Sequence, residues 1–203
     1  MSSVSEQIPV EPAPPEWGAT ASPKNEVGAL HLLGELLQNL LIAGILILIV
    51  NLATARIRVD GSSMEPSLHD GELVVVNRLA YRWSDLARGD IIVFNFPFDP
   101  DRRFIKRLIG LPGDRIMVQD GRLYINNAPV EEPYIAAPPL YRGTWTVGPD
   151  EVFVLGDNRN NSSDSQNWGM LPINEIIGKA VVVYWPVADA EVIPHYSLAA
   201  AAQ

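Results

Sequence analysis

A serine and a lysine that lie 43 positions apart are the residues of this chain best suited to nucleophilic catalysis. Ser63 lies in the run Gly61-Ser62-Ser63-Met64-Glu65-Pro66-Ser67-Leu68, and Lys106 lies within Phe104–Asp114. A serine hydroxyl is a poor nucleophile until a base removes its proton, and a neutral lysine amine can be that base. The two residue types therefore predict a serine–lysine site for acyl transfer.

Lys106 is preceded by Ile105, and Leu108 and Ile109 follow close behind it. In an alternating strand Phe104, Lys106 and Leu108 share one face. A neutral lysine needs its pKa lowered by roughly 3 units, or about 4 kcal/mol, and an apolar strand face can supply that desolvation. The alternative is a lysine that extends its amine along the surface into water, which is common for strand lysines. The Ser-x-x-Lys spacing is absent, because Pro66 stands three residues after Ser63.

The histidines are weaker candidates for the base. His69 lies in a polar turn beside Asp70, His195 lies in a Pro/Ala-rich tail, and His31 precedes a long apolar segment. They are scattered, with no i, i+4 pair, and the chain has no cysteine. The sequence therefore predicts no metal site and no disulfide.

A third candidate segment is the polar run 156–169, which is dense in short hydrogen-bonding side chains. Such side chains are suited to holding an amine in place. The same composition is also typical of an ordinary polar loop after a strand, and the residues alone leave both interpretations open.

The elements that must position these residues follow from length and composition. A chain of 203 residues has room for one domain of moderate size, a tail and an anchor. Its formal net charge of −9 argues against a nucleic-acid partner, which requires a basic face.

A membrane anchor is predicted over residues 30–55. No residue from Leu36 to Ala55 is charged, and twenty helical residues span roughly 30 Å, about one hydrocarbon core. A cleavable signal would be shorter, closer to the start and preceded by basic residues, whereas Lys24 is the only Lys or Arg in the first 55. The Pro-rich residues 1–29 are predicted to be a disordered tail.

Residues 56–187 predict a β-rich domain, followed by a C-terminal tail over residues 188–203. Asp120-Gly121 between two short strands indicates a hairpin, and the lack of βαβ alternation argues against a parallel sheet. Single helical turns are expected within 78–86 and 174–177. The predicted strands are 56–59, 73–76, 91–96, 104–109, 116–118, 123–125, 152–155 and 181–185.

Four segments in this order resemble the motifs of type I signal peptidase, a membrane-bound serine endopeptidase. They are Ser63–Leu68, with Ser67 where threonine is common, Gly89–Phe94, Lys106–Asp114 and Gly156–Asp164. The resemblance runs from about Ile57 to Pro186. The acidic tail and single anchor look most like the cyanobacterial or plastid branch.

The resemblance implies a mostly β fold, an antiparallel β-sheet catalytic domain with one N-terminal transmembrane helix. It implies that Ser63 is the nucleophile and Lys106 the general base, with no cofactor and no metal. Ser162 would orient the lysine amine, and Asp164 would support the local loop.

Two positions depart from the family pattern. The oxyanion hole would use the Ser63 backbone N–H, but Gly61 stands where many members carry a second, hydroxyl donor, so a backbone group or Ser62 would substitute. Gln166 stands where many carry arginine, which removes an ion pair with Asp164. The short region 115–150 also implies that the large accessory β domain of some relatives is missing.

The resemblance further implies small residues at positions −1 and −3 of the cleaved chain. For Val93 and Leu68, plain core packing is an equally good interpretation. The apolar residues that would line the substrate pocket are Ile57, Val59, Met64, Leu68, Val93, Phe104 and Ile105.

The implied partners are exported preproteins and the lipid bilayer, at the plasma or thylakoid membrane. Signal peptides are removed on the periplasmic or lumenal side, where the domain is expected. Arg56 and Arg58 after the helix favour the opposite, cytoplasmic, orientation by the positive-inside bias, and the sequence leaves this conflict open.

Two other functions are compatible with parts of the chain. A self-cleaving Ser-Lys protease of the SOS repressor type would need an N-terminal DNA-binding helix pair, where this chain has an apolar segment. A catalytically dead, membrane-anchored β domain would have little need of both Ser63 and Lys106.

Overall fold

The computed structural model describes residues 26–198, so most of the predicted tail 1–29 and residues 199–203 lie outside it. The chain divides at Ile45/Leu46 into two units, which are described separately. Helix α1 (Glu26–Ala53) begins four residues before the predicted start of the anchor. Its segment Leu30–Ala53 is long and apolar enough to cross a membrane, with a mean hydropathy of 2.3.

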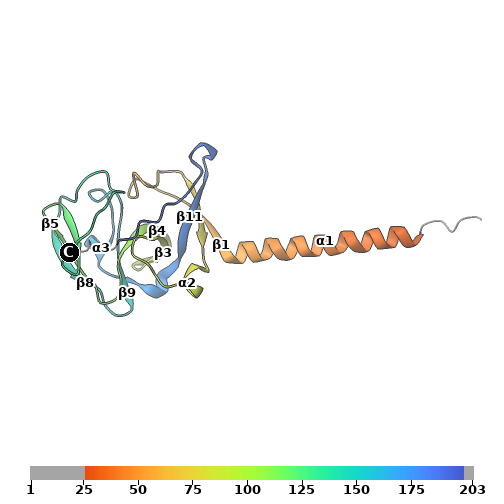
Figure 1. Cartoon of the computed structure of the whole chain (residues 1–203), viewed down its shortest axis with the longest axis horizontal. Helices are drawn as coiled ribbons and strands as arrows, with labels where there is room; N and C mark the ends of the chain where they lie inside the picture. Colours follow the sequence, from red (N-terminus) through yellow and green to blue (C-terminus); the bar gives the residue numbers. More distant parts are fainter. Residues whose placement is uncertain (1–25, 199–203) are drawn as a thin grey trace, which may run out of the picture. The chain divides into compact units, whose positions relative to one another are not determined.

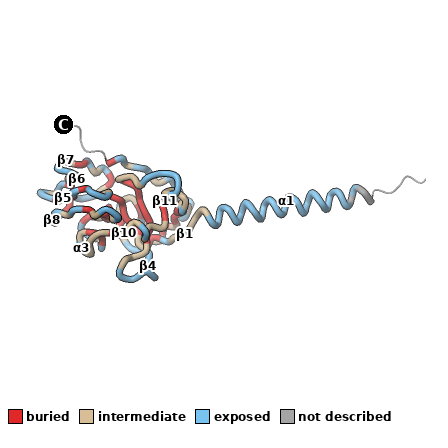
Figure 2. Tube along the Cα trace, turned by 90° about the horizontal axis from the view of Figure 1, so that it is seen from below, coloured by how far each residue is buried: buried red, intermediate tan, exposed pale blue. Residues whose placement is uncertain are grey.

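The leucine and isoleucine side chains of α1 are exposed along its length (Figure 2). Exposing a helix that is apolar on all sides to water is unfavourable, and such a helix is typical of a membrane span. The prediction of one apolar helix of spanning length is confirmed.

The second unit is built mainly of antiparallel strands, as predicted (Figure 1). Its larger sheet has the order β1-β2-β11-β3-β4-β9-β10, with β12 paired to β11. Strands β2 and β3 follow each other in the sequence but are not neighbours, because β11 returns between them. The strands of this sheet are β1 (Thr54–Arg58), β2 (Leu73–Asn77), β3 (Ile91–Phe96), β4 (Asp99–Gly110), β9 (Glu151–Leu155), β10 (Leu171–Pro172), β11 (Ile176–Trp185) and β12 (Glu191–Val192).

Two of these strands extend beyond their predicted bounds. β4 begins at Asp99 rather than Phe104, and β11 begins at Ile176 rather than Val181. Short helical turns lie where they were expected, as α2 (Ala80–Trp83) and the 3₁₀ turn η1 (Ile173–Glu175); a further 3₁₀ turn, η2, spans Val187–Asp189.

The region 115–150 forms a separate four-stranded sheet of order β7-β6-β5-β8. Its strands are β5 (Arg115–Gln119), β6 (Arg122–Ile125), β7 (Ala128–Pro129) and β8 (Gly143–Thr146). The predicted hairpin at Asp120-Gly121 is confirmed, since β5 pairs with β6 and both turn residues have positive φ, 51° and 74°. The region 115–150, which was expected to lack a large accessory β domain, therefore folds into this small sheet.

Three apolar clusters form the core of the β-rich unit, and one of them, which contains Ile109, Ile116 and Phe153, joins the two sheets. The other two explain why β3 and the second half of β4 are rich in apolar residues. Val93 and Ile105 belong to one cluster, whereas Ile92, Phe94 and Leu108 belong to another. Both faces of these central strands are therefore covered. Strand β4, which carries Lys106, is fixed from both sides.

Candidate active site

Ser63 lies in a turn within the loop of residues 59–72 that joins β1 to β2. Val59 and Glu72 close the base of the loop, with the Val59 N–H donating to the Glu72 carbonyl at 2.8 Å. Gly61 has a φ of 83°, in the left-handed region that favours glycine, and its N–H donates to Asp70 Oδ1 at 2.7 Å. The turn is thus held at both ends.

Two side chains anchor this turn in the core. Met64 and Leu68 are fully buried, and the Leu68 N–H donates to the Met64 carbonyl at 2.9 Å. Ser63 lies between Gly61 and these two buried residues, and it is half-buried on the side that faces Lys106.

Lys106 reaches this serine directly. Its Nζ donates to Ser63 Oγ at 2.7 Å and to the Ile105 carbonyl at 2.9 Å. Only 4% of the lysine is exposed, and its Nζ lies 5.4 Å from the centre of the Phe104 ring. The lysine therefore does not extend to the surface, and the structure brings the two candidate residues together.

Burial has a direct consequence for the protonation of Lys106. Desolvation lowers its pKa to about 8 from the usual 10.5, and the nearby carboxylates of Asp164 and Asp157 oppose that shift. About half of the lysine is then neutral at pH 8. In the neutral form its nitrogen lone pair can accept the Ser63 proton.

The polar loop 156–164 is hydrogen-bonded to the turn that carries Ser63. The Asn158 N–H donates to the Ser63 carbonyl at 3.1 Å, and Asn158 Nδ2 donates to the Ser62 carbonyl at 3.1 Å. Asn161 Nδ2 donates to Ser62 Oγ at 3.0 Å. A β carbon on Gly156 would collide with the Ser63 carbonyl, so this close approach requires glycine.

Asp164 holds the far end of that loop. It is fully buried, accepts from the Gly156 N–H at 2.9 Å, and caps the short helix α3 (Ser165–Trp168) through the Gln166 N–H at 3.2 Å. Burial raises the pKa of this carboxyl group. Gln166 lies where an arginine was expected from the family pattern, and backbone N–H groups satisfy Asp164 instead.

The Oγ of Ser162 is buried near Gly156 and the Asp164 carboxylate, but it makes no well-aligned hydrogen bond among the described residues. The two hydrogen bonds of Lys106 go to Ser63 and to Ile105. The role of Ser162 in orienting the amine remains a prediction.

Sequence reasoning missed a buried ion pair next to Lys106. Arg107 donates to Asp157 from Nε at 2.8 Å and from Nη2 at 2.6 Å, and both side chains are fully buried. Its Nη1 donates to the Gly89 carbonyl at 2.8 Å, and its guanidinium lies 4.0 Å from the centre of the Tyr134 ring. This pair fastens β4 to the loop that clasps Ser63.

A second buried arginine secures the same loop from outside. Arg159 Nη1 donates to Glu132 Oε2 at 2.7 Å, and its Nε donates to the Gly156 carbonyl at 3.1 Å. Tyr134 donates to the same Glu132 at 2.8 Å. For Arg107 the available signal was a charged residue inside an otherwise apolar run, whereas Arg159 lies in a polar run that gave no such signal.

A cleft of about 750 Å³ opens beside the serine and the lysine. Of the seven residues predicted to line a substrate pocket, Ile57, Phe104 and Ile105 line this cleft. The other four are packed in the core with at most 1% exposure, because their strands and turn face inward; these are Val59, Met64, Leu68 and Val93. Arginines supply much of the remaining lining, which the sequence interpretation did not anticipate.

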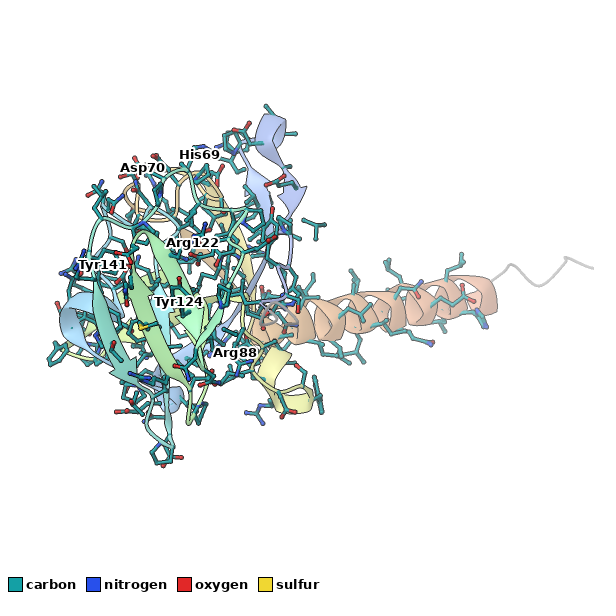
Figure 3. All side chains as sticks on the ribbon, turned by 60° about the vertical axis from the view of Figure 1, so that its left-hand side comes forward. His69, Asp70, Arg88, Arg122, Tyr124 and Tyr141 are labelled. Carbon is teal, nitrogen blue, oxygen red and sulfur yellow. The ribbon has the colours of Figure 1, made fainter. Side chains whose placement is uncertain are left out.

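Each of the histidines lies beside a carboxylate rather than beside Ser63. His69 Nδ1 lies 3.3 Å from Glu72, and His195 Nδ1 lies 2.9 Å from Asp90. His69 and Asp70 are labelled at their turn in Figure 3. Among the described residues no cluster of three or more His, Asp or Glu side chains has the arrangement of a metal site.

Fold and site together define a class: an antiparallel β-sheet protein in which a serine hydroxyl meets a buried, weakly basic lysine amine. A family model described as signal peptidase, peptidase S26, matches residues 33–185. The chain therefore belongs to the signal peptidase family, a family of serine endopeptidases, and the resemblance seen in its motifs is confirmed.

Similar proteins include enzymes of cyanobacteria and of a chloroplast. Signal peptidase I of Leptolyngbya laminosa is 39% identical over 197 residues, covering 92% of this chain and 94% of that enzyme. Probable signal peptidase I-2 of Synechocystis sp. is 46% identical over 136 residues, 64% of this chain but only 62% of that enzyme. Thylakoidal processing peptidase 1 of Arabidopsis thaliana is 37% identical over 139 residues, covering 63% of this chain and 41% of that enzyme.

Among solved structures, a signal peptidase I from Enterococcus faecalis matches with a TM-score of 0.45 and 33% identity. The match covers 47% of this chain and 97% of that chain.

Proposed function

We propose that this chain acts as signal peptidase I and removes N-terminal signal peptides from exported preproteins through an acyl-enzyme on Ser63. The observation that carries the proposal is the 2.7 Å approach of Lys106 Nζ to Ser63 Oγ inside a buried, apolar setting. An amine with a pKa of about 8 at that distance is a competent general base near neutral pH.

In the first half-reaction, Ser63 Oγ attacks the carbonyl carbon of the scissile bond while its proton moves to Lys106 Nζ. The tetrahedral intermediate collapses as the C–N bond breaks, and Lys106 returns the proton to the leaving amine. In the second half-reaction, Lys106 takes a proton from water, and the hydroxide attacks the ester on Ser63. Collapse releases the carboxyl product and returns the proton to Ser63.

The oxyanion of that intermediate requires hydrogen-bond donors. Within the described residues the Ser63 N–H donates to no protein group, so it is free to serve. Ser62 Oγ accepts from Asn161 at 3.0 Å, which leaves its own proton free for a second bond. This free proton supports the expectation that Ser62 substitutes for the hydroxyl donor that Gly61 lacks.

Substrate binding is supported by two open strand edges. β1 pairs only with β2, and β4 pairs with β9 only from Arg107 onward, so residues 99–106 have one free edge. Residues of β1 and of this part of β4 line the same cleft. An extended peptide can add its backbone hydrogen bonds there. Small side chains at −1 and −3 fit against Ile57, Phe104 and Ile105.

The apolar helix α1 supports a single-pass anchor in the plasma or thylakoid membrane. We place the β domain on the periplasmic or lumenal side because signal peptides are removed there. Two arginines after the helix bias topology without fixing it. Reporters fused after Gln203 test this: a reporter that works only outside the cytoplasm should be active. Activity of a cytoplasmic reporter alone at that point would contradict the assignment.

The function is tested with the full-length chain in detergent and a preprotein that has alanine at −1 and −3. We expect one cut after the −1 residue, read by mass spectrometry of the new N-terminus. Ser63→Ala should give no product, and Ser84→Ala, a serine of the chain outside the cleft, should cleave normally. Cleavage by Ser63→Ala at the wild-type rate would refute the proposed nucleophile.

A further inference from the structure

The cleft beside Ser63 is basic, although the whole chain carries a net charge of −9. Arg56 and Arg58 line it from β1, and Arg102 and Arg103 line it from β4. The acidic residues of the lining are Asp60 and Asp101. An acidic protein thus places four of its exposed arginines around the opening through which a substrate must pass.

These arginines differ from the arginines that hold the fold together. Arg107 and Arg159 are each buried against a carboxylate. Within the part of the chain that the structure describes, Arg56, Arg102 and Arg103 take part in no ion pair. Their guanidinium groups are therefore available to a partner.

One further cleft arginine, Arg58, has only a loose partner. It approaches Asp60 at 3.7 Å, with both side chains largely exposed, which is a weak interaction.

Arg102 is also held close to the reacting groups. Its guanidinium carbon lies 5.3 Å from the centre of the Phe104 ring, and Lys106 Nζ lies 5.4 Å from the same centre. The three residues alternate along β4 and share one face. From Arg102 to Lys106 the strand spans roughly 13 Å, which corresponds to about four residues of an extended substrate peptide.

We propose that Arg102 and Arg103, with Arg56 and Arg58 opposite, select substrates that carry a carboxylate at −4 or −5 before the scissile bond or at +3 to +5 after it. The inference rests on the proposed function and deepens it by naming a charge preference. A guanidinium matches a carboxylate with paired hydrogen bonds, and it keeps its charge at every working pH. The expected substrates have Asp or Glu at one of these positions.

An anionic lipid headgroup has the same charge and is the competing occupant. The cleft favours the peptide, because the arginines line the same cavity as Ser63 and Lys106. A polypeptide must enter that cavity for hydrolysis to occur, so its side chains pass the arginines in every turnover.

The experiment uses the full-length chain in a zwitterionic detergent without anionic lipid. Peptides with alanine at −1 and −3 carry Glu, Gln or Lys singly at −4, −5, +3, +4 or +5. For at least one position we expect kcat/KM for Glu to exceed that for Gln by about 3- to 10-fold at low salt. The ratio should shrink in 0.5 M salt, since exposed charges are screened.

Variants decide where the preference arises. Arg102→Glu with Arg103→Glu should reverse the order so that Lys peptides exceed Glu peptides, whereas Arg102→Lys should retain the Glu preference. Arg122→Gln, on β6 outside the cleft (Figure 3), is the matched control and should leave the ratio unchanged.

Three results would overturn the inference. They are equal rates for Glu and Gln at all positions, a Glu preference that survives the charge reversal, and an effect of the arginine variants seen only with anionic vesicles. The last result would assign the arginines to lipid headgroups. Cleavage of the Gln peptide in all three cases would leave the proposed function intact, whereas failure to cleave any peptide would contradict the function itself.

Discussion

Two adjacent residues of β4, Lys106 and Arg107, are both buried cations, yet they have opposite surroundings. Lys106 has a hydroxyl and a carbonyl as its hydrogen-bond partners, and desolvation lowers its pKa to about 8. Arg107 meets the carboxylate of Asp157 through two hydrogen bonds. The comparison teaches that a buried cation without a hydrogen-bonded carboxylate can act as a base, whereas a buried cation with such a carboxylate stabilises the fold.

Both cations act on the same turn. Lys106 donates to Ser63, and Arg107 Nη2 lies 3.3 Å from Ser67 Oγ in that turn. Strand alternation sends the two side chains to opposite faces, so a single strand supplies both the chemistry and its support. The division of roles predicts that the two residues fail in different ways when replaced.

Replacing the base should have the largest effect. We expect Lys106→Ala to lower kcat by about 10⁴-fold or more, because Ser63 is then left without a proton acceptor. Ser63→Ala should do the same, and the double variant should be no worse than either single variant. Circular dichroism should show an intact β domain in all three. Substantial turnover by Lys106→Ala would remove the lysine from the mechanism.

Replacing Arg107 should act first on the free energy of unfolding. Arg107→Leu leaves the Asp157 carboxylate buried without its partner, which costs about 3–5 kcal/mol of the free energy of unfolding. Denaturant unfolding measures it, with Arg122→Leu on the exposed side of β6 as the matched control. The double variant Arg107→Leu/Asp157→Leu should recover much of the loss. An Arg107→Leu protein as stable as the control would show that the pair does not hold β4 to the loop.

The strands illustrate what the sequence could predict of the fold. Apolar β-branched runs identified β3 with its observed bounds and located β2, β5, β6 and β9 within a residue or so. The first half of β4 and the whole of β8 were missed, because their residues are largely exposed and show no apolar alternation. The joining of β11 between β2 and β3 is a long-range pairing that no local pattern encodes.

The site divides in the same way. Motif order and the apolar neighbours of Lys106 predicted the serine–lysine pair, which the structure places together. The Arg107–Asp157 pair spans 50 positions and was missed, because each residue alone is typical of an exposed surface. Val59, Met64, Leu68 and Val93 were predicted to line a pocket but pack in the core, since an apolar residue near a site looks the same in either role.

The pH dependence of activity tests the comparison at Lys106. Since only the neutral amine accepts a proton, kcat/KM should rise about tenfold per pH unit below pH 8 and level off above an apparent pKa of about 8. Initial rates on one peptide between pH 6 and 10 measure it. A profile governed by a group near 6.5 and abolished by replacing His69 would assign the base to histidine instead.

The same shift predicts how stability depends on pH. The lysine binds its proton more weakly in the folded state, with a pKa of about 8 against 10.5 when unfolded. The resulting penalty, about 3 kcal/mol, is fully present below pH 8 and disappears as pH rises toward 10.5. Lys106→Met should therefore be more stable than wild type at pH 7, with the difference shrinking by pH 10. A constant difference across that range would contradict the lowered pKa.

Ser162 gives the smallest expected effect and the finest test of how the amine is held. Its buried hydroxyl makes no well-aligned hydrogen bond among the described residues, so Ser162→Ala should leave the free energy of unfolding within about 0.5 kcal/mol of wild type. If the hydroxyl accepts the third proton of the Lys106 ammonium during turnover, kcat should fall about tenfold while KM stays constant. That hydrogen bond stabilises the charged amine, so its loss should also lower the apparent pKa of the kcat profile. A merely structural serine would leave this pKa in place, and an unchanged profile together with an unchanged kcat would assign the orientation of the amine to Ser63 and the Ile105 carbonyl alone.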